Sequence, residues 1–175
     1  MNNETQTLLS HIVENTYTVG DIHRRLGTLR QTVEHVLFTQ SNIPFMEACA
    51  EFLSRTDEVD TQDVRALEQW GEPVFKAFTQ QNVAARISSL QTEIDMLPVL
   101  TLYIPVEFPA EEITFLGQWA RTHCHESVMM DVHIDPAVVG GCAFVWNDAY
   151  HEFSFRTRIK EHVGIITTTL SDYAK

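Results

Sequence analysis

Four consecutive residues near position 125, His123-Cys124-His125-Glu126, carry side chains that could bind a metal ion, and His133 follows nearby. Imidazole and thiolate groups are common zinc ligands. Adjacent residues on a helix or a strand point in different directions, however, and no Cys-x-x-Cys or His-x-x-x-His pair supplies the remaining ligands. The sequence therefore favours a polar connection between a helix and a strand over a metal site, and we expect no cofactor.

A cysteine nucleophile is the second chemistry that these residues could support. Cys124 or Cys142 beside a histidine would suit a small thiol-dependent hydrolase. A cysteine in a strand is commonly a small buried apolar residue, and Cys142 falls where an inward strand position is expected. With Cys49 the cysteines are odd in number and widely spaced, which predicts reduced thiols in a cytosolic protein. A metal- or thiol-dependent hydrolase using His123, Cys124 and His125 remains the alternative to a non-catalytic function.

Charge and composition exclude several other classes of function. The 175 residues carry a net charge of -12, whereas nucleic-acid binding depends on clustered Lys and Arg. Residues Gly140-Gly141 lack the pattern of a phosphate-binding loop. No apolar run approaches the roughly 20 residues of a membrane-spanning helix, and the N-terminus has no apolar signal segment. We therefore expect a protein of the cytosol that binds no nucleic acid and does not insert into a membrane.

The first 97 residues are predicted to form helices throughout, because their apolar residues recur every three or four positions. The longest repeat runs from Val19 to Val36 without a miss. Gly71 and Pro73 predict that a fourth helix stops near Trp70 and that a fifth follows directly. Counting all such stretches gives six helices, which short connections would hold in an antiparallel bundle.

After Pro98 the pattern changes to that of a small α+β domain. A β-rich run occupies residues 99–104, and residues 128–134 alternate in a way that predicts one buried and one solvated strand face. Asn147-Asp148 lies between two further short strands and predicts a tight hairpin turn. The order of elements predicts helices covering one face of a mixed sheet. A final helix after Ser154 is expected to turn inward with Phe155, Ile159, Val163, Ile166 and Leu170.

Residues 132–145, Val-His-Ile-Asp-Pro-Ala-Val-Val-Gly-Gly-Cys-Ala-Phe-Val, carry a resemblance to a known family. The stretch is similar to the pattern of an apolar strand, Asp-Pro, two apolar residues, Gly-Gly and a second strand in the delta subunits of rotary ATP synthases, the family of the mitochondrial oligomycin-sensitivity-conferring protein. The family usually has Asp-Gly before the serine, where this chain has Glu152 and Phe153. The positions that match the motif are Asp135, Pro136, Gly140, Gly141, Asp148, Ser154, Arg156 and Arg158.

This resemblance implies a fold and a function. The fold is α+β: a six-helix bundle in residues 1–97 that binds the catalytic head, and a domain in residues 98–175, with a mixed sheet and two helices, that binds the peripheral stalk. The protein would be a non-catalytic subunit of a proton-translocating ATP synthase, peripheral on the cytoplasmic face of the membrane. Its partners would be the N-terminal helix of an alpha subunit and the helices of the stalk b subunit. Candidates for the head-binding groove of the bundle are Leu8, Ile12, Val74, Phe75 and Phe78.

Overall fold

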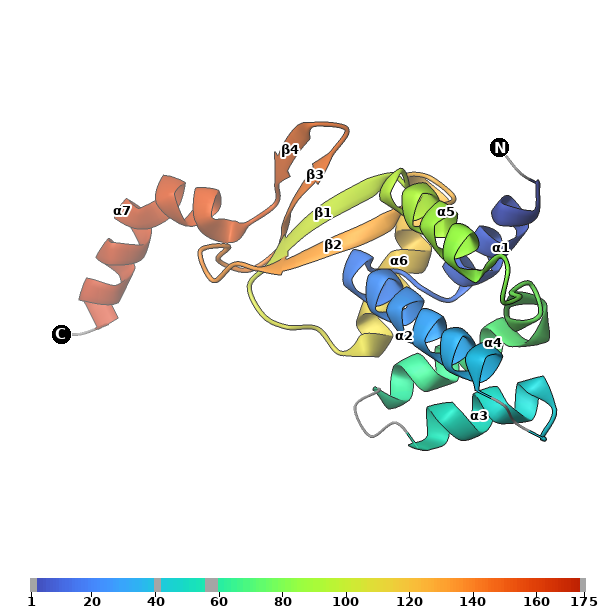
Figure 1. The fold of residues 1–175 in the computed structure, drawn as a ribbon. Coiled ribbons are helices and arrows are strands. Elements are labelled where there is room, and N and C mark those ends of the chain that lie inside the picture. The colour runs from blue at the N-terminus through green and yellow to red at the C-terminus, as the bar shows by residue number, and fades with distance from the viewer. Residues whose placement is uncertain (1–2, 40–41, 56–59, 174–175) are drawn as a thin grey trace.

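The computed structural model describes residues 3–39, 42–55 and 60–173 and shows an α+β fold (Figure 1). Within these residues a helical region comes first, followed by a four-stranded mixed sheet with two further helices. The helical region and the last helix lie at opposite ends of the molecule, with the sheet between them (Figure 1). The first helices are α1 (Asn3–Glu14), α2 (Val19–Phe38), α3 (Phe45–Arg55), α4 (Thr61–Phe75) and α5 (Val83–Asp95).

The predicted count of six helices before the sheet is not confirmed, because α4 continues past the predicted stop near Trp70 and ends at Phe75, so it includes the start of the fifth predicted helix. Gly71 leaves the helical backbone region with φ 64° and ψ -165°, and Pro73 follows it inside the same element. The glycine kinks the helix as its residue type predicts, but helical turns resume at once and leave no loop. The described helical region is therefore a bundle of five helices, one of them sharply kinked.

One large core holds the bundle together. Leu29, Leu67 and Leu90 are fully buried and come from three different helices. Helix spacing therefore places the apolar stripes of the amphipathic helices on a common interior, as the sequence predicts. The core also includes Leu8, Ile12, Val13, Ile22, Leu26, Val33, Val36, Ala48, Cys49, Leu53, Trp70, Val74, Phe75, Phe78, Val83, Ile87, Ile94 and Met129.

A buried carboxylate ties α2 to α4. Asp63 is 1% exposed and accepts hydrogen bonds from Arg24 and from Arg25, the latter at 3.0 Å. Arg25 also donates to the backbone oxygen of Asn15 at 3.0 Å and to the hydroxyl of Thr16 at 2.8 Å. Because a buried charge is tolerated only when it is paired and hydrogen-bonded, this network fixes the segment between α1 and α2.

The sheet consists of β1 (Val99–Ile104), β2 (Met129–Ile134), β3 (Ala143–Trp146) and β4 (Ala149–Glu152), with α6 (Ala110–His123) between β1 and β2. The strand order is β2-β1-β3-β4. Strands β1 and β2 are parallel, whereas β1 with β3 and β3 with β4 are antiparallel. The mixed sheet and the hairpin confirm the predicted α+β class. Helix α6 packs on one face over a small core of Leu100, Ala120 and Val128, beside Phe144 and Trp146.

The segment between α1 and α2 joins the bundle to the sheet. Tyr17 accepts a backbone hydrogen bond from Met130 at 2.8 Å, and Thr18 forms an isolated parallel bridge with Met130. The guanidinium of Arg121 on α6 lies 4.4 Å from the centre of the Tyr17 ring. Gly117 faces the same ring so closely that a Cβ atom would lie 2.4 Å from it. The two regions are therefore packed against each other and share backbone contacts.

Docking of the bundle changes the burial pattern of β2. The predicted alternation would bury Val128, Met130 and Ile134 and leave Met129 in water. Instead, Met129 is 1% exposed and belongs to the core of the bundle, while Ile134 is 56% exposed. The prediction of one wet face was therefore wrong for the first half of β2, because the bundle covers the second face there.

The last helix is α7 (Phe155–Tyr173). The sequence predicts that it packs on the sheet, and this prediction was wrong. It extends away from the strands (Figure 1), and every described side chain along it is exposed. The predicted inward residues Phe155, Ile159, Val163 and Leu170 are between 42% and 65% exposed, and the side chain of Ile166 lies outside the described residues. The loop before β3 sets this direction, because Val139 and Gly140 contact Phe155 at the start of α7.

Candidate functional site

The residues of the family-like motif gather where the chain leaves the sheet and enters α7. Asp135 donates its backbone N–H to the carbonyl of Ile104 at 2.8 Å, which continues the β1–β2 pairing by one step. Its carboxylate accepts the backbone N–H of Ala137 at 2.9 Å, an arrangement typical of an Asx turn. Pro136 lies inside this turn. Asp135-Pro136 therefore ends β2 and reverses the chain, as the sequence predicts.

Gly140 and Gly141 have φ angles of 65° and 74°, which side chains disfavour. They also leave no room for one, because a Cβ on Gly140 would lie 2.5 Å from the ring of Phe155, and one on Gly141 would lie 2.2 Å from the carbonyl oxygen of Phe153. A backbone hydrogen bond joins the same segments, because the N–H of Phe155 donates to the carbonyl of Val139 at 3.0 Å. The Gly-Gly pair therefore holds the entry to α7 against the sheet.

The remaining motif positions form the hairpin and the first turns of α7. Asn147 and Asp148 have φ angles of 49° and 62° between paired strands, which confirms the predicted two-residue turn. Ser154 is buried, and its hydroxyl donates to the carboxylate of Glu152. Arg156 is exposed, and the side chain of Arg158 lies outside the described residues. The motif thus positions α7 through backbone geometry, and its exposed described residues include Pro136, Asp148 and Arg156.

Helix α7 carries an apolar face that is largely exposed, although the Phe155 ring at its start lies against Gly140. Five of its exposed side chains fall at steps of four, four, seven and three positions, which places them on one side of a helix. We call this set the α7 stripe: Phe155, Ile159, Val163, Leu170 and Tyr173. An exposed apolar stripe of this kind is the usual surface for pairing with another helix. No described helix is both long enough and apolar enough to cross a membrane.

The five residues predicted to line a groove of the bundle are placed elsewhere. Leu8, Ile12, Val74, Phe75 and Phe78 are each at most 5% exposed and belong to the bundle core. Their helical spacing points them at the opposite helices, so they stabilise the bundle and do not form an open surface. A sequence pattern that marks an apolar face cannot by itself separate a core face from a binding face.

An open groove does exist on the bundle, between α1 and the end of α5. Its volume is about 830 Å³, and its apolar lining comes from Leu9, Val13, Met96 and Leu97. Met96 is 64% exposed. We call this cavity the α1–α5 groove. Sequence reasoning missed Leu9 and Met96, although their positions beside the buried helix stripe were a usable signal. Its acidic lining residues are Glu14, Glu93 and Glu126.

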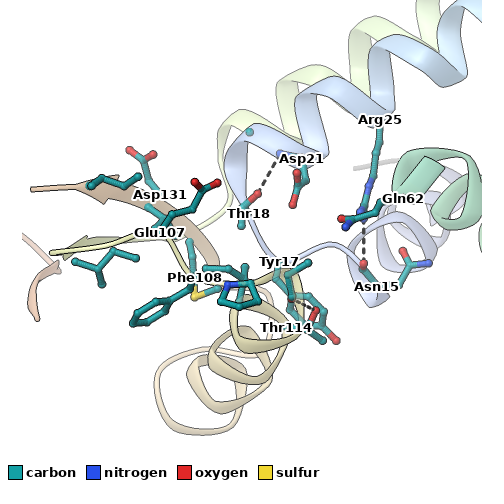
Figure 2. A pocket seen from close by; sticks show the side chains of 18 residues that line it. Asn15, Tyr17, Thr18, Asp21, Arg25, Gln62, Glu107, Phe108, Thr114 and Asp131 are labelled. Carbon is teal, nitrogen blue, oxygen red and sulfur yellow. Dashed lines mark hydrogen bonds between the residues drawn. The ribbon is translucent and has the colours of Figure 1, made fainter. Parts of the chain in front are cut away.

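A second groove of about 770 Å³ runs beside the outer edge of β2, where the start of α2 and the loop before α6 form its walls (Figure 2). Its apolar lining includes Ile104, Phe108 and Met130. We call it the edge groove. Its described carboxylates are those of Asp21, Glu107 and Asp131.

The His123-Cys124-His125-Glu126 cluster forms the end of α6 and the turn after it. The His123 ring stacks on Trp119 with centres 4.6 Å apart, and its Nδ1 lies 2.8 Å from the Trp119 carbonyl. The Nδ1 of His125 accepts the backbone N–H of Ser127 at 3.2 Å. Across the described residues no three His, Cys, Asp or Glu side chains come together as metal ligands would. His133 lies apart from this cluster on β2, and its Nε2 lies 2.9 Å from a carboxylate oxygen of Asp131.

Burial makes two of the three thiols poor nucleophiles. It raises the pKa of Cys49 to about 11 and also raises the pKa of Cys142. A thiolate is the reactive form of cysteine, so both thiols are protonated near neutral pH. The predicted inward strand position of Cys142 is not observed, because β3 begins one residue later: Cys142 is half-buried before the strand, and the buried inward residue is Ala143.

Comparison with known proteins does not place this chain in a family. No protein-family model matches the sequence, and no curated protein matches it either.

Proposed function

We propose that this chain is a non-catalytic adaptor, the peripheral-stalk subunit that links the catalytic head of a proton-translocating rotary ATP synthase to its stator. Two unpartnered surfaces support a linking function, the α1–α5 groove on the bundle and the α7 stripe at the other end of the molecule. The family-like motif supports the particular complex, since its glycines and turn residues position α7.

The α7 stripe is the observation that carries this proposal. A helix of 19 residues is about 28 Å long at 1.5 Å per residue, enough to run beside a stalk helix for several turns. In proteins most of the stability of an amphipathic helix comes from packing of its apolar face. A stalk helix pairing with the stripe would supply that packing and bury side chains such as Phe155 and Leu170.

The α1–α5 groove is the proposed site for the alpha-subunit helix of the catalytic head. Its apolar floor, with Leu9 and Met96 accessible, suits the apolar face of an amphipathic helix. Glu14, Glu93 and Glu126 at its margin favour a partner with basic residues beside that face, because complementary charges speed and orient association. The site is proposed on these residues, which replace the five buried candidates from the sequence.

Resistance to rotor torque would require a stiff connection between the two surfaces. The Asp63 network, the Tyr17–Met130 backbone bond and the insertion of Met129 into the bundle supply several such links. Load applied at α7 would pass through the Gly140-Gly141 corner and the sheet into the bundle. The protein would then act by binding both partners and by resisting deformation between the two binding surfaces. No feature of the His123–Glu126 segment favours the alternative hydrolase.

The proposal is tested by binding measurements with purified stalk b and head alpha subunits from the same source. The double substitution Ile159→Asp with Val163→Asp places charges on the stripe and should abolish b binding while leaving alpha binding unchanged. Thr168→Asp, an exposed change on the opposite side of α7, is the matched control and should leave both interactions intact. Removal of residues 155–175 should match the double substitution.

The reciprocal variant is Leu9→Asp, which should weaken alpha binding and leave b binding unchanged. Circular dichroism of each variant would show that the fold is retained. Full b binding by the stripe variant, or failure of the unaltered chain to bind either subunit, would refute the proposed function.

A further inference from the structure

Strand β2 is an edge strand whose outer side is only partly covered. The sheet order places β1 on one side of β2. On the other side, the only described partner is the single bridge between Thr18 and Met130. The chain turns away into α2 at Val19, directly after this bridge. The remainder of the outer edge, as far as Ile134, therefore borders the edge groove instead of another strand.

Three hydrogen bonds show which backbone groups point outward. Met129 donates to Pro98 at 2.9 Å and Asp135 donates to Ile104 at 2.8 Å, so both face β1. Met130 donates in the opposite direction, to Tyr17 at 2.8 Å. Since backbone groups alternate along a strand, the N–H and C=O groups of Val132 and Ile134 must also point outward.

These outward groups have no hydrogen-bond partner among the described residues. Natural proteins usually protect such an edge with Lys, Pro, a bulge or a covering loop. Here Val132 and Ile134 are apolar, and the first proline follows only at Pro136. The Tyr17–Met130 bond shows that the same edge already pairs with an extended segment of this chain. The edge therefore has the geometry of a strand-addition site.

The edge groove supplies side-chain contacts for a bound segment. Phe108, Ile113 and Met130 give it an apolar lining. Figure 2 shows the carboxyl groups of Asp131 and Glu107 projecting to the same side of it. Arg25 also lines the groove, but its guanidinium bonds Asp63, Thr16 and the Asn15 carbonyl. Asp21 pairs with Arg24 and Asp131 with His133, which leaves Glu107 as the lining carboxylate without an ion pair among the described residues. With three carboxylates against Arg25, the charge of the lining is negative.

We propose that the outer edge of β2, at Val132 and Ile134, binds an extended peptide segment of a partner protein that carries basic side chains. The segment adds to the sheet as a fifth strand beside β2. Its backbone pairs with the outward groups, its apolar side chains enter the groove, and its Lys or Arg side chains meet Glu107 and Asp131. The turn at Asp135-Pro136 limits the pairing to a few residues. This surface is separate from the α7 stripe and the α1–α5 groove.

The probe is a fluorescein-labelled peptide of four Lys-Val repeats, titrated with the full chain and followed by fluorescence anisotropy. The first control peptide has the same sequence with every backbone nitrogen methylated, which keeps the charge but removes the N–H donors. The second replaces Lys by Glu. We expect saturable binding of the basic peptide that weakens with salt, and at least tenfold weaker binding of both controls.

Three substitutions locate the site. Val132→Pro removes an outward N–H without removing a β1–β2 hydrogen bond, and should weaken binding about tenfold. Glu107→Gln should weaken it about threefold, whereas Glu111→Gln, a charge change on α6 outside the groove lining, should have no effect.

Amide NMR of the unaltered chain gives a readout that does not depend on any substitution. Titration with the basic peptide should shift the Val132 and Ile134 amides while those of α7 stay unchanged. Absence of binding, equal binding of the methylated peptide, or shifts confined to other segments would overturn the proposal. Equal effects of Glu107→Gln and Glu111→Gln would show attraction by net charge alone and would overturn it as well.

Discussion

The N-terminal bundle buries its apolar side chains, whereas the C-terminal region leaves many of its own in contact with solvent. Among the described residues of the bundle, the large apolar side chains with high exposure are Phe38, Ile43 and Met96. All the others follow Pro98 in the chain. They are Val99, Val106, Phe115, Trp119, Ile134, Val139, Tyr150, Phe153, Phe155, Ile159, Val163, Ile165, Leu170 and Tyr173.

The sizes of the two cores explain this difference. The bundle core draws on all five of its helices, while the core between α6 and the sheet centres on Leu100, Ala120 and Val128. Further buried apolar residues of the sheet region are Leu102, Ile104, Met130, Val138 and Ala143. The sheet region still buries fewer apolar side chains than the bundle and therefore gains less stability from its own packing. The bundle therefore has the larger core, to which Met129 of β2 also belongs, while the side chains of the α7 stripe remain exposed.

The largest expected effect is the loss of a buried leucine from the bundle. Leu29→Ala removes a fully buried side chain and should lower the free energy of unfolding by about 2–5 kcal/mol. Ile159→Ala is the matched control on α7, where the side chain is 42% exposed, and should change it by less than about 0.5 kcal/mol. Urea denaturation followed by tryptophan fluorescence measures both. Equal destabilisation by the two substitutions would show that α7 packs on the rest of the chain.

Most of the fold follows from the sequence because local rules govern it. Helical periodicity predicts α1, α2, α3 and α5, and the turn residues predict the hairpin at Asn147-Asp148. The count of helices was not confirmed, because Gly71 and Pro73 mark a break in helix geometry without specifying whether a loop follows. Local sequence describes backbone preference, whereas the length of an interruption depends on packing.

The candidate surfaces were less predictable, since a helical stripe looks the same whether it meets a core or a partner. Leu8 and Phe75 were expected in a groove and lie in the core, while Phe155 and Leu170 were expected inside and lie in water. The burial of Met129 depends on the bundle, which is distant in sequence. Such placements depend on long-range contacts, and a single sequence does not specify which of two apolar faces is covered.

A smaller effect on stability is expected at the Gly140-Gly141 turn, which joins the sheet to the exposed helix α7. Gly141→Ala forces a side chain into φ 74° and against the Phe153 carbonyl, which should lower stability by about 2 kcal/mol. Gly27→Ala in α2 is the control, because nothing lies within 4 Å of its Cβ position, and should raise stability by up to about 1 kcal/mol. Thermal denaturation measures both. An unchanged melting temperature for Gly141→Ala would show that the corner does not hold the entry to α7.

The smallest effect should come from Gly164→Ala, and it tests whether α7 is independent of the bundle. Gly164 lies in the middle of α7 with nothing within 4 Å of its Cβ position, so alanine should favour the helix by about 0.5–1 kcal/mol. Because the described side chains of α7 are exposed and its packing on the Gly140 loop is at Phe155, nine residues away, this gain should raise the ellipticity at 222 nm and leave the urea midpoint of the bundle unchanged. The same substitution should tighten binding of a stalk helix by about two- to fivefold, because less ordering remains to be done on association. A shift of the urea midpoint of the bundle, with no change in helicity, would mean that the rest of the chain stabilises α7. The contrast between the bundle and the C-terminal region would then be smaller than the exposure of the α7 side chains indicates.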